Sequence, residues 1–281
     1  RGRILSLSIL QRLIESSGTS KSGLFAIYID LEQYFDRIPR RKLWRALRKR
    51  GVPKRVVKLL RDLYSNTRCC VRSENTVGPW FKVACGVRQG SVEGHLLANI
   101  YMDHMMRKVL RRYPDMGIAF QYRHDGRWVD AADMDFETRI ACLMYADDCA
   151  LFASSEADLQ TLYNALVEEF KADGMLISIS KTEASVYRAW VTAAEWLDPK
   201  VYHADGTQVK EATAFKYLGQ HKERRGAKTE VNVRIASAHS AWHLLKAKLF
   251  RCKRLAVKLR IRLYSCLVTS RLLSAAETIP M

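Results

Sequence analysis

Residues 143–152 read Leu-Met-Tyr-Ala-Asp-Asp-Cys-Ala-Leu-Phe, so that apolar residues lead up to two adjacent aspartates and continue after them. This pattern predicts two short buried strands joined by a tight hairpin, with Asp147 and Asp148 at its tip. A plain turn is one interpretation, because Asp tolerates turn geometry. Two neighbouring carboxylates among core residues repel each other, however, and a divalent cation would remove that repulsion because hard cations bind carboxylate oxygens.

A third carboxylate has a matching setting. Residues 24–29 form an apolar run with β-branched and aromatic members, which predicts a buried strand, and Asp30 follows it directly. If this strand lies beside the hairpin, Asp30, Asp147 and Asp148 meet at one edge of a sheet. Two Mg²⁺ ions held ~3.5–4 Å apart by carboxylates are typical of in-line phosphoryl transfer. The sequence therefore predicts a phosphoryl-transfer site at this edge.

The composition indicates an intracellular protein with a polyanionic partner. The chain has 281 residues, of which 48% are hydrophobic, enough for one large or two modest domains. The formal net charge of +18 makes nucleic acid the default partner. A basic membrane-surface protein is the alternative, but no lipidation signal and no apolar run of ~18 residues is present. Seven cysteines without a CxxC pair indicate reduced thiols in the nucleus or cytoplasm.

The positive charge is concentrated in two segments with helical apolar spacing. Residues 37–61 and 231–276 are rich in Arg and Lys and contain no acidic residue. Such runs are usually solvated helix faces, but at this density self-repulsion favours a phosphate backbone nearby. Gly51-Val52-Pro53 is expected to divide the first segment into two helices.

Several further elements follow from local patterns. A helix is expected over residues 4–15, and β-hairpins over 67–83 and 117–129, the latter with a turn at Asp125-Gly126. Ser155 and Asp158 form a capping box for a helix that Gly174 ends, and a strand over 175–179 follows.

The segment Gly-Val-Arg-Gln-Gly-Ser at 86–91 reads as a loop that approaches a ligand. Its two glycines permit close backbone approach, and Ser91 can cap the helix that follows. Gly94, in the first turn of that helix, is expected to cost up to ~1 kcal/mol relative to Ala.

The ordered set of motifs resembles the reverse transcriptases, and more narrowly the LINE-type (non-long-terminal-repeat) retrotransposon enzymes. The segments that carry the resemblance are Ile-Asp-Leu-Glu-Gln-Tyr-Phe-Asp at 29–36, Arg-Gln-Gly-Ser at 88–91, Tyr-Ala-Asp-Asp at 145–148, Lys-Thr-Glu at 181–183 and Phe-Lys-Tyr-Leu-Gly at 215–219. Residues 122–127 also resemble an insertion found in some of these enzymes. Together these motifs cover nearly the whole chain.

The resemblance implies an α+β protein with the right-hand polymerase fold. Its ferredoxin-like palm and partial fingers would occupy residues 1–225, and an α-helical, possibly truncated thumb would occupy 226–281. Because the chain starts with Arg-Gly-Arg rather than Met, we expect it to be a fragment that begins after the upstream fingers.

The resemblance also implies roles for individual residues. Asp30, Asp147, Asp148 and the carbonyl of Leu31 would hold two Mg²⁺ ions, with Mn²⁺ as an alternative. Lys181 would lie near the phosphates and protonate pyrophosphate, although a lone Lys is ordinarily solvated surface. Phe35 would stack under the sugar and reject a ribose 2′-OH, with a plain core Phe as the alternative. The remaining contacts would be Leu31, Gln89 and Gly90 to the nucleotide, and Arg88, Tyr217, Leu218, Gly219, Lys246, Lys248, Arg251 and Lys253 to primer and template.

The chain departs from the family pattern at two places. Tyr34 replaces the usual Ala, and Val-Glu-Gly-His at 92–95 replaces Pro-Leu-Ser-Pro, which removes a proline that pre-sets the helix start. Asp36 is expected to be a structural carboxylate paired with Arg37 or Arg40.

The implied function is RNA-directed DNA polymerisation, in which a primer 3′-OH attacks the α-phosphate of a dNTP. The partners would be an RNA template, a DNA primer and dNTPs, with no membrane and with an endonuclease domain elsewhere in the full-length protein. One alternative is a catalytically inactive nucleic-acid-binding remnant, which residues 92–95 and the missing fingers favour and the three aspartates oppose. The other is another two-metal palm enzyme, such as a nucleotide cyclase, which the lack of its glycine-rich signatures and the presence of Arg88-Gln89-Gly90 oppose.

Overall fold

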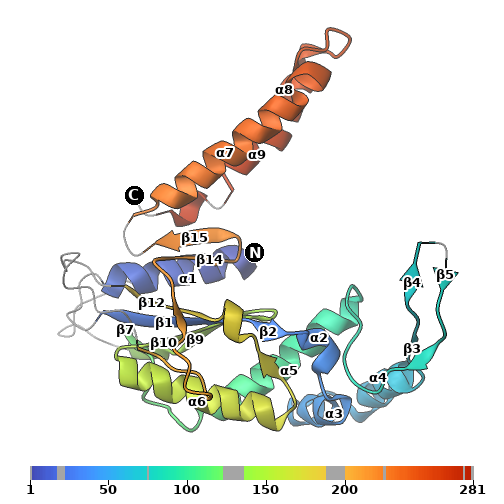
Figure 1. Cartoon of the computed structure of the whole chain (residues 1–281), viewed down its shortest axis with the longest axis vertical. Helices are drawn as coiled ribbons and strands as arrows, with labels where there is room; N and C mark the ends of the chain where they lie inside the picture. Colours follow the sequence, from blue (N-terminus) through green and yellow to red (C-terminus); the bar gives the residue numbers. More distant parts are fainter. Residues whose placement is uncertain are drawn as a thin grey trace. The chain divides into compact units, whose positions relative to one another are not determined.

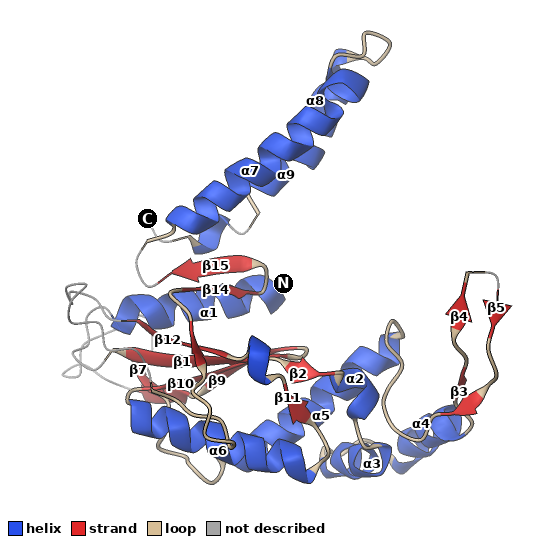
Figure 2. Ribbon diagram, in the orientation of Figure 1, coloured by secondary structure: helices blue, strands red, loops and turns tan. Residues whose placement is uncertain are grey.

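The computed structural model describes residues 2–17, 23–74, 76–122, 136–187, 200–223, 226–274 and 276–279. The chain divides into two compact units. One contains Phe25–Ala184 and Pro199–Lys210, and the other contains Arg1–Leu24, Ser185–Asp198 and Glu211–Met281. Helices and strands occur in both units (Figure 2), which confirms the α+β class. Within the described ranges, no helix is long and apolar enough to cross a membrane.

The central sheet follows from apolar strand segments. Its order is β13-β12-β1-β10-β9. The bounds are β1 Leu24–Ile29, β9 Cys142–Tyr145, β10 Asp148–Ala153, β12 Glu183–Tyr187 and β13 Lys210–Glu211. Every residue of β1 and all but the first of β10 are buried, as their continuous apolar runs predict. Helices α5 (Val92–Leu110) and α6 (Glu156–Ala172) pack on each other and lie against one face of this sheet (Figure 1).

The first basic segment forms helices that lead into one hairpin made of two short ladders. The helices are α2 (Tyr34–Arg37), α3 (Arg40–Lys49) and α4 (Lys54–Ser65), and the break between the last two is confirmed, with Gly51 at φ 81°. The expected hairpin over 67–83 is confirmed as β3 (Arg68–Cys69) paired with β6 (Phe81–Lys82) and β4 (Arg72–Ser73) paired with β5 (Thr76–Val77).

Part of the positive charge of residues 37–61 is used inside the unit. Lys42 pairs with Asp173, and Arg50 pairs with Asp103. The guanidinium of Arg40 donates to three backbone carbonyls, those of Gly86 (2.8 Å), Tyr64 (3.0 Å) and Val83 (2.8 Å). These bonds tie α3 to the end of α4 and to the loop after β6. The segment is therefore only partly available to an external phosphate backbone.

The expected ion pair of Asp36 is not formed. Among the described residues, no salt bridge joins Asp36 to Arg37 or Arg40, and Asp36 is exposed. Arg40 satisfies its donors on carbonyls instead. The prediction was wrong because adjacency in sequence does not report the direction of a side chain on a short helix such as α2.

Two other predicted elements have shifted bounds. Strand β7 (Ile118–Tyr122) pairs with β8 (Phe136–Ile140), so the second strand of the hairpin expected over 117–129 was misplaced. The register joins Ile118 to Ile140 and Phe120 to Thr138. The expected turn at Asp125-Gly126, and all of the insertion at 122–127 except Tyr122, lie outside the described residues. The strand expected over 175–179 is reduced to β11 (Leu176–Ile177), which pairs with β2 (Leu31–Glu32), and a 3₁₀ turn, η2 (Ile179–Lys181), follows.

The capping predictions hold. The helix expected over 4–15 is α1 (Gly2–Ser17). The hydroxyl of Ser155 accepts from the Asp158 amide at 3.1 Å and starts α6. Gly174, at φ 75°, follows the end of that helix.

The second unit combines a hairpin with a long helical pair. Strands β14 (Ala214–Tyr217) and β15 (Gln220–Glu223) form the hairpin. The helical elements are α7 (Lys228–Leu245), η4 (Lys246–Phe250), α8 (Val257–Tyr264), η5 (Ser265–Thr269), α9 (Ser270–Leu272) and η6 (Ala276–Thr278). Ala238, Ala241 and Val268 form a small core, against which Trp242 and Phe250 pack. The helical character expected of the thumb is present, whereas the functional division at residue 225 stays a prediction.

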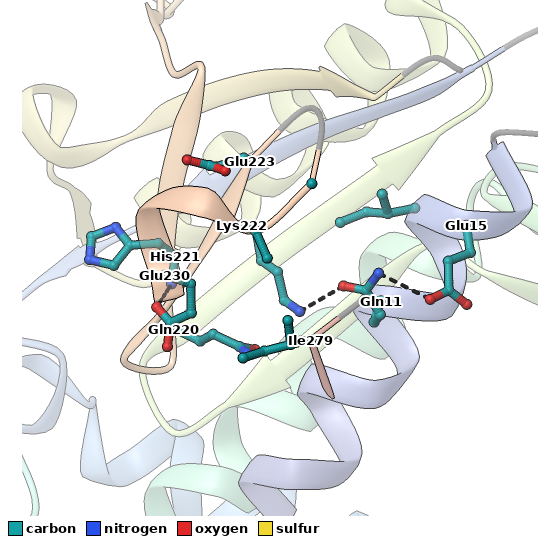
Figure 3. Close-up of a pocket in the computed structure, with 11 residues that line it drawn as sticks. Gln11, Glu15, Gln220, His221, Lys222, Glu223, Glu230 and Ile279 are labelled. Atoms are coloured by element: carbon teal, nitrogen blue, oxygen red, sulfur yellow. Dashed lines mark hydrogen bonds between the residues drawn. The ribbon is translucent and has the colours of Figure 1, made fainter. Parts of the chain in front are cut away.

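A buried lysine lies beside a cavity of about 140 Å³ in this unit (Figure 3). Only 4% of Lys222 is exposed, and its Nζ donates to Gln11 Oε1 at 2.8 Å and to the Thr278 carbonyl at 2.9 Å. Burial lowers the pKa of Lys222 to about 8, against the opposing effect of the Glu230 and Glu15 charges. The bonds join α1, β15 and η6 through one ammonium group.

This lowered pKa predicts a pH-dependent stability. An unfolded lysine has a pKa near ~10.4, so between pH ~8 and ~10.4 the unfolded chain binds more protons and the free energy of unfolding rises with pH, by up to ~3 kcal/mol. Lys222→Met should remove this rise. It is measured as the difference between the free energies of unfolding by urea at pH 7.5 and at pH 10. Lys216→Met, at an exposed position of the same hairpin, is the control. Equal pH slopes for the two variants would contradict the assignment.

Candidate active site

The pairing of β1 with β10 sets two carboxylates opposite each other. The strands are antiparallel neighbours, and Ile29 pairs with Cys149. The next residue beyond Ile29 is Asp30, and the residue before Cys149 is Asp148. The expected adjacency of the two strands is therefore confirmed, and both carboxylates lie at the same edge of the sheet.

The hairpin between β9 and β10 holds a strained backbone. Tyr145 pairs with Asp148, which leaves Ala146 and Asp147 in the turn. Ala146 adopts φ 57°, in the left-handed region where a Cβ costs ~1–2 kcal/mol. Strain of this kind persists only where the surrounding structure imposes it, and it gathers at functional sites. Asp147 is thus presented from the turn itself, and Asp148 from the first position of the strand.

The three carboxylates interact electrostatically. Burial raises the pKa of Asp148 above its usual range, and the charges of Asp147 and Asp30 raise that pKa further. One cation lies beside them: Lys181 Nζ is 3.1 Å from Asp30 Oδ2. The Ser178 amide donates to the Asp30 carbonyl at 2.9 Å, which brings η2 and its lysine to this edge.

The donor set suits a hard divalent cation, although the side chains are not arranged as ligands. In the part of the chain that is described, no three His, Cys, Asp or Glu side chains are grouped closely enough to hold a metal ion. Carboxylate oxygens are nevertheless the ligands that Mg²⁺ prefers, and mutual repulsion at Asp148 is what such an ion would relieve. Leu31, expected to offer its carbonyl, is buried in β2 opposite Ile177.

Phe35 is held next to the loop 86–91. It lies half-buried in α2, and its carbonyl accepts from the Val87 amide at 2.8 Å. The Gly86 amide donates to the Ile38 carbonyl at 2.8 Å. Gly86 has φ 78°, and a Cβ there would lie 2.7 Å from the Asp36 carbonyl oxygen. The loop is therefore bonded directly to the segment that follows Asp30.

Tyr34, the first departure from the family pattern, is accommodated by α5. Its ring is 3% exposed, and its hydroxyl donates to the Ala98 carbonyl at 2.6 Å. Burial raises the pKa of Tyr34 far above its usual range, and the Asp147 charge adds to this. The Tyr34 hydroxyl thus has a buried acceptor on α5, the helix that follows the loop 86–91.

The second departure, at residues 92–95, includes a glycine that the surrounding backbone requires. A Cβ on Gly94 would lie 2.1 Å from the Arg88 carbonyl oxygen and 2.7 Å from Ser91 Oγ. Ser91 Oγ accepts from the Gly94 amide at 3.1 Å and donates to the Arg88 carbonyl at 3.0 Å. The expectation that Ala would be better than Gly here was wrong, because the loop folds back onto the helix start and leaves no room for a side chain.

The tip of the loop is open. Arg88, Gln89 and Gly90 are exposed. The Arg88 guanidinium lies over the Tyr64 ring, 5.3 Å from its centre, and donates to the Leu63 carbonyl at 3.2 Å. Arg88 is therefore partly engaged within the unit, whereas Gln89 and Gly90 face solvent.

The hairpin β14–β15 has a tight two-residue tip. Leu218 and Gly219 adopt φ 48° and 77°, as two-residue hairpin turns require. The Gly219 carbonyl accepts from Arg234 Nη2 at 2.8 Å, and Arg234 also pairs with the buried Glu230. Tyr217 is only 2% exposed, so this expected primer contact is a buried residue.

The expected basic contacts after α7 differ in exposure. Lys248, Arg251 and Lys253 are exposed, whereas Lys246 is half-buried with its Nζ 5.9 Å from the centre of the Trp242 ring. These residues follow one another through η4 and the turn after it. Three positive charges of this group are therefore free to meet a polyanion.

The packing at Gly94 predicts a stability effect opposite to helix propensity. Gly94→Ala should lower the free energy of unfolding by ~1–3 kcal/mol, because the new Cβ meets backbone that must move. Gly78→Ala is the control, since its Cβ would lie 3.3 Å from the nearest atom, the Val71 carbonyl oxygen. Urea unfolding measures both. A Gly94→Ala protein as stable as the control would contradict the close approach.

Comparison with known proteins agrees with this geometry. The family model described as "Reverse transcriptase (RNA-dependent DNA polymerase)" matches residues 6–222. The chain is 27% identical over 168 residues to the "Retrovirus-related Pol polyprotein from type-1 retrotransposable element R2" of Nasonia vitripennis, which covers 60% of this chain and 15% of that protein. Apo telomerase from Candida Tropicalis superposes with a TM-score of 0.50 at 12% identity, over 98% of this chain and 45% of the telomerase chain. The last likeness supports the right-hand polymerase fold that the sequence predicted.

Proposed function

The chain belongs to the reverse transcriptase (RNA-dependent DNA polymerase) family, and on that premise we propose that it is the polymerase domain of a LINE-type retroelement. The observation that carries the proposal is the register that sets Asp30 opposite Asp148, with Asp147 in the adjoining turn. The chain spans about 15% of the length of its R2 relative, so the activity of a whole element is a proposal as well.

The proposed reaction is nucleotidyl transfer. The oxygen of the primer 3′-OH forms a bond to the α-phosphorus of a dNTP as the bond to the β-phosphate oxygen breaks, and pyrophosphate leaves. Asp30, Asp147 and Asp148 would hold two Mg²⁺ ions, or Mn²⁺, which when bound neutralise the carboxylates and polarise phosphate oxygens. Lys181, 70% exposed, offers an ammonium proton to the leaving pyrophosphate from beside Asp30.

The proposed nucleotide contacts surround Phe35. Its backbone bond to Val87 fixes the residue, so its ring can act as a steric barrier to a ribose 2′-OH. Gln89 and Gly90 are exposed at the tip of the same loop, where a base or sugar can approach them. Leu31, buried in β2, supports the backbone next to Asp30.

The proposed primer and template contacts combine one hairpin with basic side chains. Leu218 and Gly219 would present backbone to the primer strand, and Tyr217 would support them from the core. Arg88, Lys246, Lys248, Arg251 and Lys253 would meet phosphates. An RNA template, a DNA primer and dNTPs are the proposed partners, with an endonuclease domain elsewhere in the full-length protein and a nuclear or cytoplasmic location.

One rival function is removed, and one of the two arguments for the other is weakened. Family membership removes the nucleotide cyclase. The inactive remnant was favoured by residues 92–95, but the close packing around Gly94 is that of a segment which fits its loop rather than disturbing it.

The carboxylate assignment is tested by primer extension with Mg²⁺ on an RNA template. Asp147→Asn or Asp30→Asn should remove several kcal/mol of transition-state stabilisation, on the order of 10³-fold in rate, while primer–template affinity stays unchanged. Chelation of the metal should have the same effect. Asp36→Asn, at an exposed position in α2, is the control. Extension at the wild-type rate by Asp147→Asn would remove the catalytic assignment.

The basic residues after α7 are tested by the salt dependence of primer–template binding. Gln substitutions at Lys248, Arg251 and Lys253 together should flatten the slope of log affinity against log salt by up to ~2.7, at ~0.9 for each duplex phosphate that the protein no longer neutralises. The control makes the same three charge changes at Arg45, Arg48 and Lys49, which are exposed on α3. If both sets flatten the slope equally, binding is diffuse rather than localised after α7.

A further inference from the structure

His95 replaces a proline of the family pattern, and its ring contacts Phe35. The two ring centroids are 5.2 Å apart with planes at 63°, an edge-to-face arrangement. His95 lies in the first turn of α5 and is exposed, whereas Phe35 is half-buried in α2. The contact therefore joins the helix after loop 86–91 to the residue proposed to select the sugar.

The imidazole is held in one orientation. His95 Nδ1 is 3.1 Å from the Ser91 carbonyl oxygen. Because a carbonyl oxygen only accepts, the neutral ring carries its proton on Nδ1 when this bond forms. Ser91 is itself fixed by its bonds to Arg88 and Gly94. The bond to Ser91 thus ties the ring that contacts Phe35 to the loop 86–91.

Phe35 is also contacted by the other departure from the family pattern. The Tyr34 and Phe35 rings are 5.7 Å apart in an edge-to-face arrangement. The Tyr34 hydroxyl is bonded to the Ala98 carbonyl in α5. Both unusual side chains, Tyr34 and His95, therefore meet the same Phe35 ring.

We propose that His95 is a positioning residue for Phe35 and thereby determines the selectivity of the enzyme for deoxyribonucleoside triphosphates. A steric barrier works only if the ring cannot turn aside when a 2′-OH approaches. The His95 ring lies 5.2 Å from the Phe35 ring, centre to centre, and so limits the space on that side of Phe35. Removing the imidazole frees that space, and a ribose then fits at lower cost.

This inference rests on the proposed function of Phe35, and the experiment separates the two. Single-nucleotide incorporation on one primer–template gives kcat/KM for a dNTP and for the matching rNTP, and their ratio is the selectivity. The variants are His95→Ala, His95→Phe, Phe35→Val and the double variant Phe35→Val with His95→Ala. His104→Ala, further along α5, is the matched control.

We expect His95→Ala to lower the selectivity about two- to tenfold, the range that corresponds to one aromatic pair. The change should come from faster use of the rNTP, with kcat for the dNTP largely retained. His95→Phe should restore the selectivity, because it keeps an aromatic edge without the imidazole nitrogens. The double variant should match Phe35→Val alone, since a residue that acts through Phe35 has no effect once that ring is gone.

A second readout does not depend on turnover. With a dideoxy-terminated primer, the matching dNTP should stabilise the protein–primer–template complex against a competitor at lower concentration than the rNTP does. His95→Ala should reduce the difference between the dNTP and rNTP concentrations that are needed, and His104→Ala should leave that difference unchanged.

Three outcomes would overturn the inference. They differ in whether the proposed role of Phe35 fails as well. If Phe35→Val relaxes selectivity and His95→Ala does not, only the role of His95 is wrong. If the double variant is less selective than Phe35→Val, His95 acts independently of Phe35. If Phe35→Val leaves selectivity unchanged in both readouts, the proposed role of Phe35 fails and the inference fails with it.

Discussion

The antiparallel register between β1 and β10 is the constraint on which the site depends. Side chains alternate along a strand, so a slip of one residue would move Asp148 to the opposite face from Asp30. Every residue of β1 and all but the first of β10 are buried, so a slip would also exchange side chains of different size within a closely packed core, which opposes it. The register between β9 and β10 places Ala146 in the turn, where its left-handed backbone is held by the paired strands on either side. Core packing thus stabilises the placement of the carboxylates.

How far the sequence could predict this structure depends on the range of the interactions involved. The strand before Asp30 and the hairpin around Asp147 follow from local apolar patterns, and the structure has both. Lys42 pairs with a residue 131 positions away, and no local pattern reports such a contact. The requirement for Gly94 likewise comes from a carbonyl that folds back onto it, whereas helix propensity alone points to the opposite conclusion.

The net charge of +18 overstates what the surface offers to a nucleic acid. Arg40 and Arg234 donate to backbone carbonyls, and Lys222 is buried with two partners. These cations hold loops and hairpin tips in place, as Arg does when its fork matches several acceptors at once. The sequence could not separate such structural cations from those that are free, because both kinds occur in the same basic runs. Exposed cations such as Lys248 and Arg251 are the ones that a nucleic acid can contact.

The departures from the family pattern are packed into the structure rather than left as isolated defects. A chain free of selection accumulates changes independently, and most of them leave buried polar groups without partners or create clashes. Here the hydroxyl of Tyr34 has a buried acceptor, Gly94 leaves space for the Arg88 carbonyl, and His95 is bonded to Ser91. These three changes fit their surroundings, whereas Val92 is 93% exposed, and two of the three contact Phe35. Changes that find partners keep the local structure intact, so these departures by themselves do not argue for an inactive remnant.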